Sequence, residues 1–337
     1  MKKASNTGES ILDHVRRTGK VRKRLRPDKT NRDEAVGLIA WGLSDADAVF
    51  RKNIAERPDS IAFIDKKNVG ASSVSSTMDS FFSFGHGCNE VLKGNAHGWQ
   101  IVREAFCVAT YSQALCQRFS IESGINYSEM PMASGGGLIH LYSLALAGDA
   151  EELADWVGRY IYNYIWEGGM EDALGDYELK LFYWELLKAQ YKREWPAVES
   201  INEEVGPFFD VLAKASGSEA DFEHALIEYC DFRLSRAYGF ESVDSTKARG
   251  SDKTQYQFQR QWFAIWPLEL LAMQAVFRRC TGRSLSLNAE HPLLKTPLMT
   301  VPSMLPFAET DYSRRLHSLG RDVYGEKWQP WDSLDLV

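Results

Sequence analysis

Apolar residues recur at steps of three and four residues along most of this chain, and this spacing restricts the fold more than any other feature. The segment that begins at Asp33 sets the pattern, with Val36, Ile39, Ala40 and Leu43 along one side. Such spacing is that of an amphipathic α-helix, while the alternation typical of strands is nearly absent. The sequence therefore predicts an all-α protein, built as a multi-helix array of stacked antiparallel helical hairpins.

The same spacing places the individual helices, which we expect over residues 33–57, 98–119, 138–147, 150–166, 177–191, 196–214, 219–238 and 262–280. Gly148 and Asp149 separate two of them. We expect Gly148 to adopt the left-handed C-cap conformation and Asp149 to cap the next helix. Residues 66–78 are small and polar, which predicts a flexible loop, and a glycine-rich connection follows around His86.

Charge divides the chain into three parts. Residues 1–32 contain eleven Lys or Arg and three Asp or Glu, a net charge of +8, and form a basic N-terminal arm. We assign residues 33–130 to an N-terminal helical subdomain. Residues 131–337 form a C-terminal helical-hairpin domain, in which prolines punctuate residues 291–306. The arm is a solvated tail or a short helix that docks on the acidic body; the alternative is a binding arm for nucleic acid or a partner.

The excess of negative charge lies in one third of the chain. Residues 149–244 contain 22 acidic and 8 basic residues, a net charge of −14, although the whole chain carries only −7. A surface of this charge repels nucleic acid and attracts basic proteins. We therefore expect a protein partner, and neither a nucleic acid nor a membrane.

The cysteines and the N-terminus bear on the cellular compartment. The five cysteines form an odd set with no C-x-x-C pair, which favours reduced residues in the core. No apolar run that would make a signal peptide follows Met1, and no stretch approaches the roughly 18 apolar residues of a membrane span. These features predict a cytoplasmic protein.

One predicted helix carries the residue types of a metal site. Its candidate ligands, at steps of three, four and three residues, are Asp221, His224, Glu228 and Asp231. A ferritin-like di-iron site needs a Glu-x-x-His motif on each of two helices, whereas this motif is Asp-x-x-His and occurs once. We interpret the four residues as a solvated acidic face and expect no metal. The alternative is a metal-dependent hydrolase that uses His224 with Asp221 and Glu228.

No other motif predicts catalysis. Three glycines follow Ser134, but neither the nucleophile-elbow pattern nor the phosphate-loop pattern is present, so we interpret them as a flexible helix entry. Cys88 and His86 could act as nucleophile and base only if the fold oriented them, which their closeness in sequence does not provide. We therefore expect no catalytic residues and no cofactor.

Three segments of the chain resemble a known family. They are residues 144–153 (LALAGDAEEL), 221–226 (DFEHAL) and 266–272 (WPLELLA). The segments are similar to elements of the all-helical immunity proteins of bacterial polymorphic-toxin and type VI secretion systems, over residues 138–295. The resemblance implies a cytosolic antidote that binds a cognate toxin, often a nuclease, and blocks its active site or its assembly. The family has no shared catalytic residues.

Charge and resemblance point to the same function. Nuclease toxins need basic surfaces to hold phosphates, and the acidic third of this chain complements such a surface. We expect an immunity protein that neutralises a basic nuclease effector through an acidic helical surface; the alternative is a helical-repeat scaffold or regulator. The carboxylates expected at the surface stand near helix starts and connecting loops. They are Glu151, Glu152, Asp155, Glu171, Asp172, Asp176, Glu178, Glu203 and Glu204.

Overall fold

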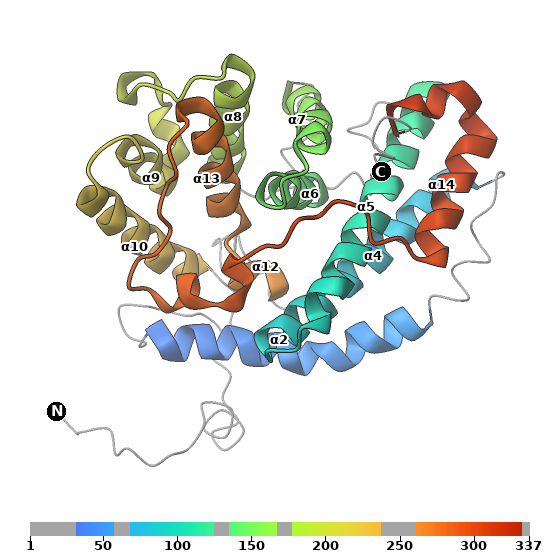
Figure 1. The fold of residues 1–337 in the computed structure, drawn as a ribbon, viewed down its shortest axis with the longest axis horizontal. Coiled ribbons are helices and arrows are strands. Elements are labelled where there is room, and N and C mark those ends of the chain that lie inside the picture. The colour runs from blue at the N-terminus through green and yellow to red at the C-terminus, as the bar shows by residue number, and fades with distance from the viewer. Residues whose placement is uncertain (1–31, 57–67, 125–134, 167–176, 237–260, 332–337) are drawn as a thin grey trace, which may run out of the picture.

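The computed structural model describes residues 32–56, 68–124, 135–166, 177–236 and 261–331 (Figure 1). Within these ranges the chain is largely helical and contains no strand, which confirms the predicted all-α class. The longer helices are α2 (Arg32–Ala55), α4 (Val69–Leu92), α5 (His97–Ser123), α6 (Gly135–Ala147), α7 (Glu151–Trp166), α8 (Tyr177–Lys192), α10 (Glu219–Arg236), α13 (Leu268–Thr281) and α14 (Asp311–Tyr324). The shorter ones are η2 (Val198–Ser200), η3 (Glu203–Phe208), α9 (Phe209–Lys214), α12 (Gln261–Ile265), η4 (Pro292–Lys295), η5 (Pro297–Met299) and η6 (Gly325–Trp331). Except for Arg32, the basic arm lies outside the described residues.

Helices α4 and α5 form a closely packed antiparallel pair. A tight turn at Gly94, whose φ is 78°, joins them. Small residues line the contact: the hydroxyl of Ser112 lies 2.8 Å from the hydroxyls of both Ser76 and Thr77. Near the turn, a Cβ added to Gly98 would lie 2.5 Å from the backbone nitrogen of Val91. The two helix backbones therefore approach to a distance that larger side chains would prevent.

The prediction of a flexible loop over residues 66–78 is wrong. From Val69 onward these residues form the first half of α4, and the glycine-rich connection predicted around His86 belongs to its second half. The Ser76 hydroxyl donates to the Ser72 carbonyl at 2.7 Å, and neighbouring hydroxyls make the same kind of bond to the preceding turn. Because these bonds and the packing on α5 satisfy the polar side chains, tertiary contacts override a weak helix propensity.

The turn between α6 and α7 differs in detail from the prediction. Asp149, and not Gly148, adopts the left-handed conformation, with a φ of 56°. Aspartate visits this region more readily than most residues because its short polar side chain can bond locally. Gly148 is required for another reason: a Cβ there would lie 2.4 Å from Cγ of Met304, whose amide donates to the Gly148 carbonyl at 2.9 Å.

Two predicted helices are interrupted by prolines. The helix expected over residues 196–214 is divided into η2, η3 and α9. Ile201 and Asn202 are extended between η2 and η3, and η3 itself is kinked at Gly206, whose φ is 56°, just before Pro207. The helix expected over residues 262–280 breaks at Pro267 into α12 and α13. Proline lacks the N–H that a continuous helix needs, and its ring clashes with the preceding turn.

A single hydrophobic core joins the two ends of the described chain. Buried residues on both sides of residue 130 belong to it. Helix α14 packs against α5, and the Tyr312 hydroxyl donates to Asp79 on α4 at 2.6 Å. Helix α2 runs below both halves of the fold in Figure 1 and contacts α4 and α12. In the described residues, the N-terminal and C-terminal helices therefore pack against one another.

The proline-rich segment, residues 291–306, packs back onto the helices. Leu293, Leu298 and Met304 are fully buried. None of the described helices combines the length and the apolarity that crossing a bilayer requires.

Candidate partner-binding surface

Six of the nine carboxylates predicted to bind a partner lie in described residues. Glu151, Glu152 and Asp155 stand on the first turns of α7, and we call them the α7-end group. The η3-end group consists of Glu178, at the start of α8, and of Glu203 and Glu204, which begin η3. The three others, Glu171, Asp172 and Asp176, lie outside the described residues.

The structure places the two groups at opposite ends of the pair formed by α7 and α8. Near the start of α7, Asp155 accepts from the side-chain amide of Gln190 on α8. Further along α7, the ring of Tyr162 stacks on Trp184, which precedes Gln190 on α8, at a centroid distance of 5.1 Å. Residue numbers thus rise along α7 as they fall along α8, so the helices are antiparallel. Over 16 residues at 1.5 Å each, the ends lie roughly 20 Å apart. The carboxylates do not form one continuous patch.

Arginines from α13 balance part of the charge at the α7 end. Arg279 lies 3.3 Å from the carboxylate of Glu151 and 3.8 Å from that of Asp155. Its neighbour Arg278 pairs with Asp149 at 2.8 Å. These arginines come from a part of the chain beyond residues 149–244, so a charge count along the sequence does not detect them. The α7 end is therefore a surface of mixed charge.

A cavity of about 390 Å³ opens at the α7 end, between α7, α8 and α13. Its lining consists of Glu151, Asp155, Arg159, Gln190, Tyr191, Arg193, Arg279 and Cys280. The Tyr142 hydroxyl donates to the side-chain oxygen Oε1 of Gln190. The side-chain nitrogen Nε2 of Gln190 donates in turn to the carboxylate of Asp155. Burial raises the pKa of Tyr191 to about 12, so its hydroxyl remains protonated at neutral pH. The cavity offers donors and acceptors to a polar side chain.

The η3 end carries carboxylates on a loop that buried contacts hold in place. The Asn202 side chain accepts from the Glu204 amide at 3.0 Å, which starts η3. The buried carboxylate of Glu185 accepts from Lys188 at 2.7 Å and from the Asn202 amide at 3.4 Å. In the ranges covered by the structure, Glu203 is exposed and makes no ion pair. Among the described residues, Glu203 thus presents an exposed negative charge at the η3 end.

The four residues weighed as a metal site on α10 do not converge. His224 and Glu228 are both exposed, and their nearest side-chain atoms lie 3.5 Å apart. Asp221 instead accepts from the Ser218 hydroxyl at 2.7 Å, and Asp231 pairs with Arg32. These contacts direct both aspartates away from His224. Asp221, His224 and Glu228 therefore lie on the solvent-exposed face of α10, whereas Asp231 lies against α2 and beside the buried His291.

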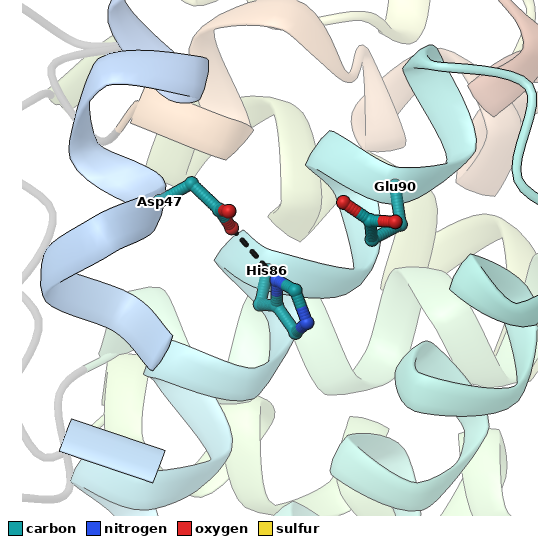
Figure 2. Close-up of side chains that lie close together, drawn as sticks. All are labelled: Asp47, His86 and Glu90. Carbon is teal, nitrogen blue, oxygen red and sulfur yellow. Dashed lines mark hydrogen bonds and ion pairs between the residues drawn. The ribbon is translucent and has the colours of Figure 1, made fainter. Parts of the chain in front are cut away.

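A different cluster, which sequence reasoning missed, joins α2 and α4. Figure 2 shows Asp47 from α2 beside His86 and Glu90 from α4, with Asp47 Oδ1 2.7 Å from His86 Nδ1. Hydrogen bonds from Asn95 and Lys93 lower the pKa of Glu90, which keeps it ionised. The His86–Glu90 spacing of four residues was the available signal, but it has meaning only in a helix.

The cluster does not include a reactive thiol. Cys88 is fully buried, and burial raises its pKa well above the usual range, so it is not a nucleophile at neutral pH. This agrees with the expectation that Cys88 and His86 form no catalytic pair.

No protein-family model, no curated protein and no solved structure matches this chain.

Proposed function

We propose that this protein is an immunity protein that acts in the cytoplasm, where it binds a basic toxin, a nuclease effector, and neutralises it. The observation that carries the proposal is the set of exposed carboxylates at both ends of α7 and α8. Carboxylates at a rim accelerate association with a basic partner without being buried unpaired. The all-α fold is also the class that the resemblance to immunity proteins implies.

The two ends of the hairpin contribute differently to this function. At the η3 end, Glu203 and Glu204 attract the basic surface that a nuclease uses for phosphates. At the α7 end, the cavity beside Asp155 and Arg279 accepts a polar side chain of the toxin, which fixes the orientation of the complex. Attraction and orientation are thus supplied by separate groups of residues.

The product of the gene adjacent to the one that encodes this chain is the partner to test. The two proteins are co-purified, their affinity is measured by isothermal titration calorimetry, and the enzymatic activity of the partner is assayed as this protein is added. We expect a tight equimolar complex and loss of the partner's activity at a ratio of one to one.

Two results would decide against the proposal. Absence of binding would overturn it for this partner, and binding without any loss of activity or of toxicity in cells would favour a scaffold or regulator. Because rim charges act over a Debye length of about 10 Å at 0.1 M salt, we also expect the association rate to fall as salt is added.

A further inference from the structure

We propose that Asp47, His86 and Glu90 bind a divalent transition-metal ion of the Zn²⁺ type, with water completing its coordination (Figure 2). One imidazole and two carboxylates are ligands that Zn²⁺ accepts, whereas sites for Mg²⁺ and Ca²⁺ are built from oxygen atoms. The proposal does not depend on toxin binding. It departs from the expectation, drawn from the sequence, that the protein has no metal.

The three side chains converge from two helices. Their ligand atoms all lie within 4.8 Å of one another. His86 and Glu90 stand one turn apart on the same face of α4, and Asp47 approaches from α2 (Figure 2). In a tetrahedral Zn²⁺ site, bonds of about 2.1 Å place the ligand atoms roughly 3.4 Å apart. Metal binding would therefore replace the hydrogen bond between His86 and Asp47. It would also turn the Glu90 carboxylate away from Lys93 and Asn95.

Close helix packing fixes the position of His86. Glycines precede and follow it, and a Cβ at Gly85 would lie 2.5 Å from the Phe50 ring on α2. At Gly87, a Cβ would lie 2.8 Å from Val102 on α5. Helix α4 is therefore held between α2 and α5 at the two residues that flank His86. A ligand on such a rigid element is positioned before the metal arrives.

The charges of the cluster favour a cation at its centre. The side chain of Asp47 is 4% exposed and that of Glu90 is 19% exposed, so both carboxylates are largely removed from water. Arg51, which is 63% exposed, contacts Asp47, and Lys93, which is 48% exposed, contacts Glu90, so solvent screens both ion pairs. Two carboxylates that approach each other repel unless a cation lies between them.

The site is open enough for an ion to enter. The side chain of His86 is 18% exposed, similar to that of Glu90. Three protein ligands leave at least one coordination position for water, as in zinc sites that are not closed by a fourth side chain.

Metal binding is tested on the full chain without a polyhistidine tag. The protein is treated with EDTA, dialysed and titrated with ZnCl₂ by calorimetry, and bound zinc is counted by mass spectrometry. We expect one zinc per chain and a rise in the melting temperature. His86→Ala and Glu90→Gln should each weaken binding by more than about tenfold, because loss of even an outer-shell partner weakens metal binding by about 10–100-fold.

His224→Ala is the matched control. His224 and Glu228 have the same spacing of four residues as His86 and Glu90, but they lie on the exposed face of α10. Removing the His224 imidazole should therefore leave zinc binding unchanged. Excess MgCl₂ should not displace the zinc. Cys280→Ala tests for binding by the half-exposed thiol and should also have no effect.

Several outcomes would overturn the proposal. The first is that the unmodified chain does not bind zinc. The second is that His86→Ala and Glu90→Gln both bind zinc as tightly as the unmodified chain does. The third is that His224→Ala or Cys280→Ala loses zinc binding. Far-UV circular dichroism shows whether each variant folds. If His86→Ala does not fold, Glu90→Gln decides, because glutamine is nearly isosteric with glutamate and can keep the same packing.

Discussion

Arg233 and Glu269 form an ion pair in which Nε and Oε1 lie 2.6 Å apart and neither side chain is exposed to solvent. The Tyr229 hydroxyl donates to the same carboxylate at 2.8 Å, and Arg233 also donates to the carbonyls of Phe263 and Trp266. Burial opposes the charge on Arg233, but the Glu269 carboxylate outweighs it, so the pKa of the guanidinium is raised. The network fastens α10 to the break between α12 and α13.

Replacing Arg233 with methionine should lower the free energy of unfolding by about 3–5 kcal/mol, because it leaves the Glu269 charge buried without a cation, with the Tyr229 hydroxyl as its remaining partner. Urea unfolding followed by circular dichroism measures this. Arg278→Met is the control: it breaks an exposed pair with Asp149 and should cost less than about 1 kcal/mol. Similar losses in the two variants would contradict the assigned role of burial.

The first test of the acidic surface is a fourfold charge reversal to lysine at Glu151, Glu152, Glu203 and Glu204. It should slow association with the toxin and remove protection in cells, while helical content stays unchanged. The reason is that rim carboxylates act mainly on the rate of encounter. Stopped-flow mixing at low and high salt measures this rate. If association at low salt is unchanged, the acidic charge serves solubility alone and the interface lies elsewhere.

Two double variants distinguish the contribution of the η3 end from that of the α7 end. They are Glu203→Lys/Glu204→Lys and Glu151→Lys/Asp155→Lys. The first should change mainly the association rate, since Glu203 makes no ion pair in the described ranges. The second should also reduce stability, because it places like charges beside Arg279. An equal loss of stability in both pairs would contradict this division.

Gly98→Ala should destabilise the fold by about 1–3 kcal/mol, because the added methyl group meets the backbone of α4, which cannot move aside as a side chain could. Thermal or urea unfolding provides the measurement. Gln117→Ala, at a half-buried position of the same helix, should change stability by less than about 0.5 kcal/mol. An unchanged Gly98→Ala variant would show that α4 and α5 can separate without cost.

Stability should fall as the pH is lowered below 6.5 because of His291. Burial lowers its pKa in the folded protein, where Nδ1 accepts from the Leu293 amide at 3.2 Å. The unfolded chain therefore binds more protons below pH 6.5, so the stabilisation is complete above that value and is lost as the pH falls toward the lower folded pKa. His291→Asn, which can still cap η4, should show a smaller loss by urea unfolding. An equal loss would assign the pH dependence to other groups.

One cysteine should react with a disulfide reagent such as DTNB in the native protein, and five should react after unfolding. All five are unpaired, but only Cys280 is accessible, since the others are buried. Burial raises the pKa of Cys116 to about 11 and that of Cys107 to about 12. Burial also raises the pKa of Cys280, so its labelling should accelerate with pH. A native Cys280→Ala variant that still reacts would contradict this assignment.

Apolar spacing was sufficient to predict most helices, because each of them buries one face in a common core. It failed for α4, whose serines and glycines carry little apolar signal. Helix α4 is stabilised by contacts with α5, such as the hydrogen bond between Ser76 and Ser112. A pattern of neighbouring residues in the sequence does not contain such contacts. It also failed at Pro267, where a helix was expected to continue and instead begins anew.

The candidate sites depend even more on contacts distant in sequence. The charge count located the carboxylates of α7 but not Arg279, which pairs with two of them from α13. Asp47 and His86 are 39 residues apart and meet only because α2 packs on α4. Since α4 was predicted as a loop and a connection, the face shared by His86 and Glu90 could not be identified.

The hydrogen bond between Asp79 and Tyr312 also constrains the order of events during protein synthesis. The two residues are 233 positions apart. At roughly 5–20 residues per second, the ribosome adds Tyr312 about 10 to 50 s after Asp79. During that interval α4 and α5 are present without α14, and the apolar face that α14 covers on α5 stays open to water and to chaperones. Helices α4 and α5 are therefore translated early but are fully buried only when α14 has been made.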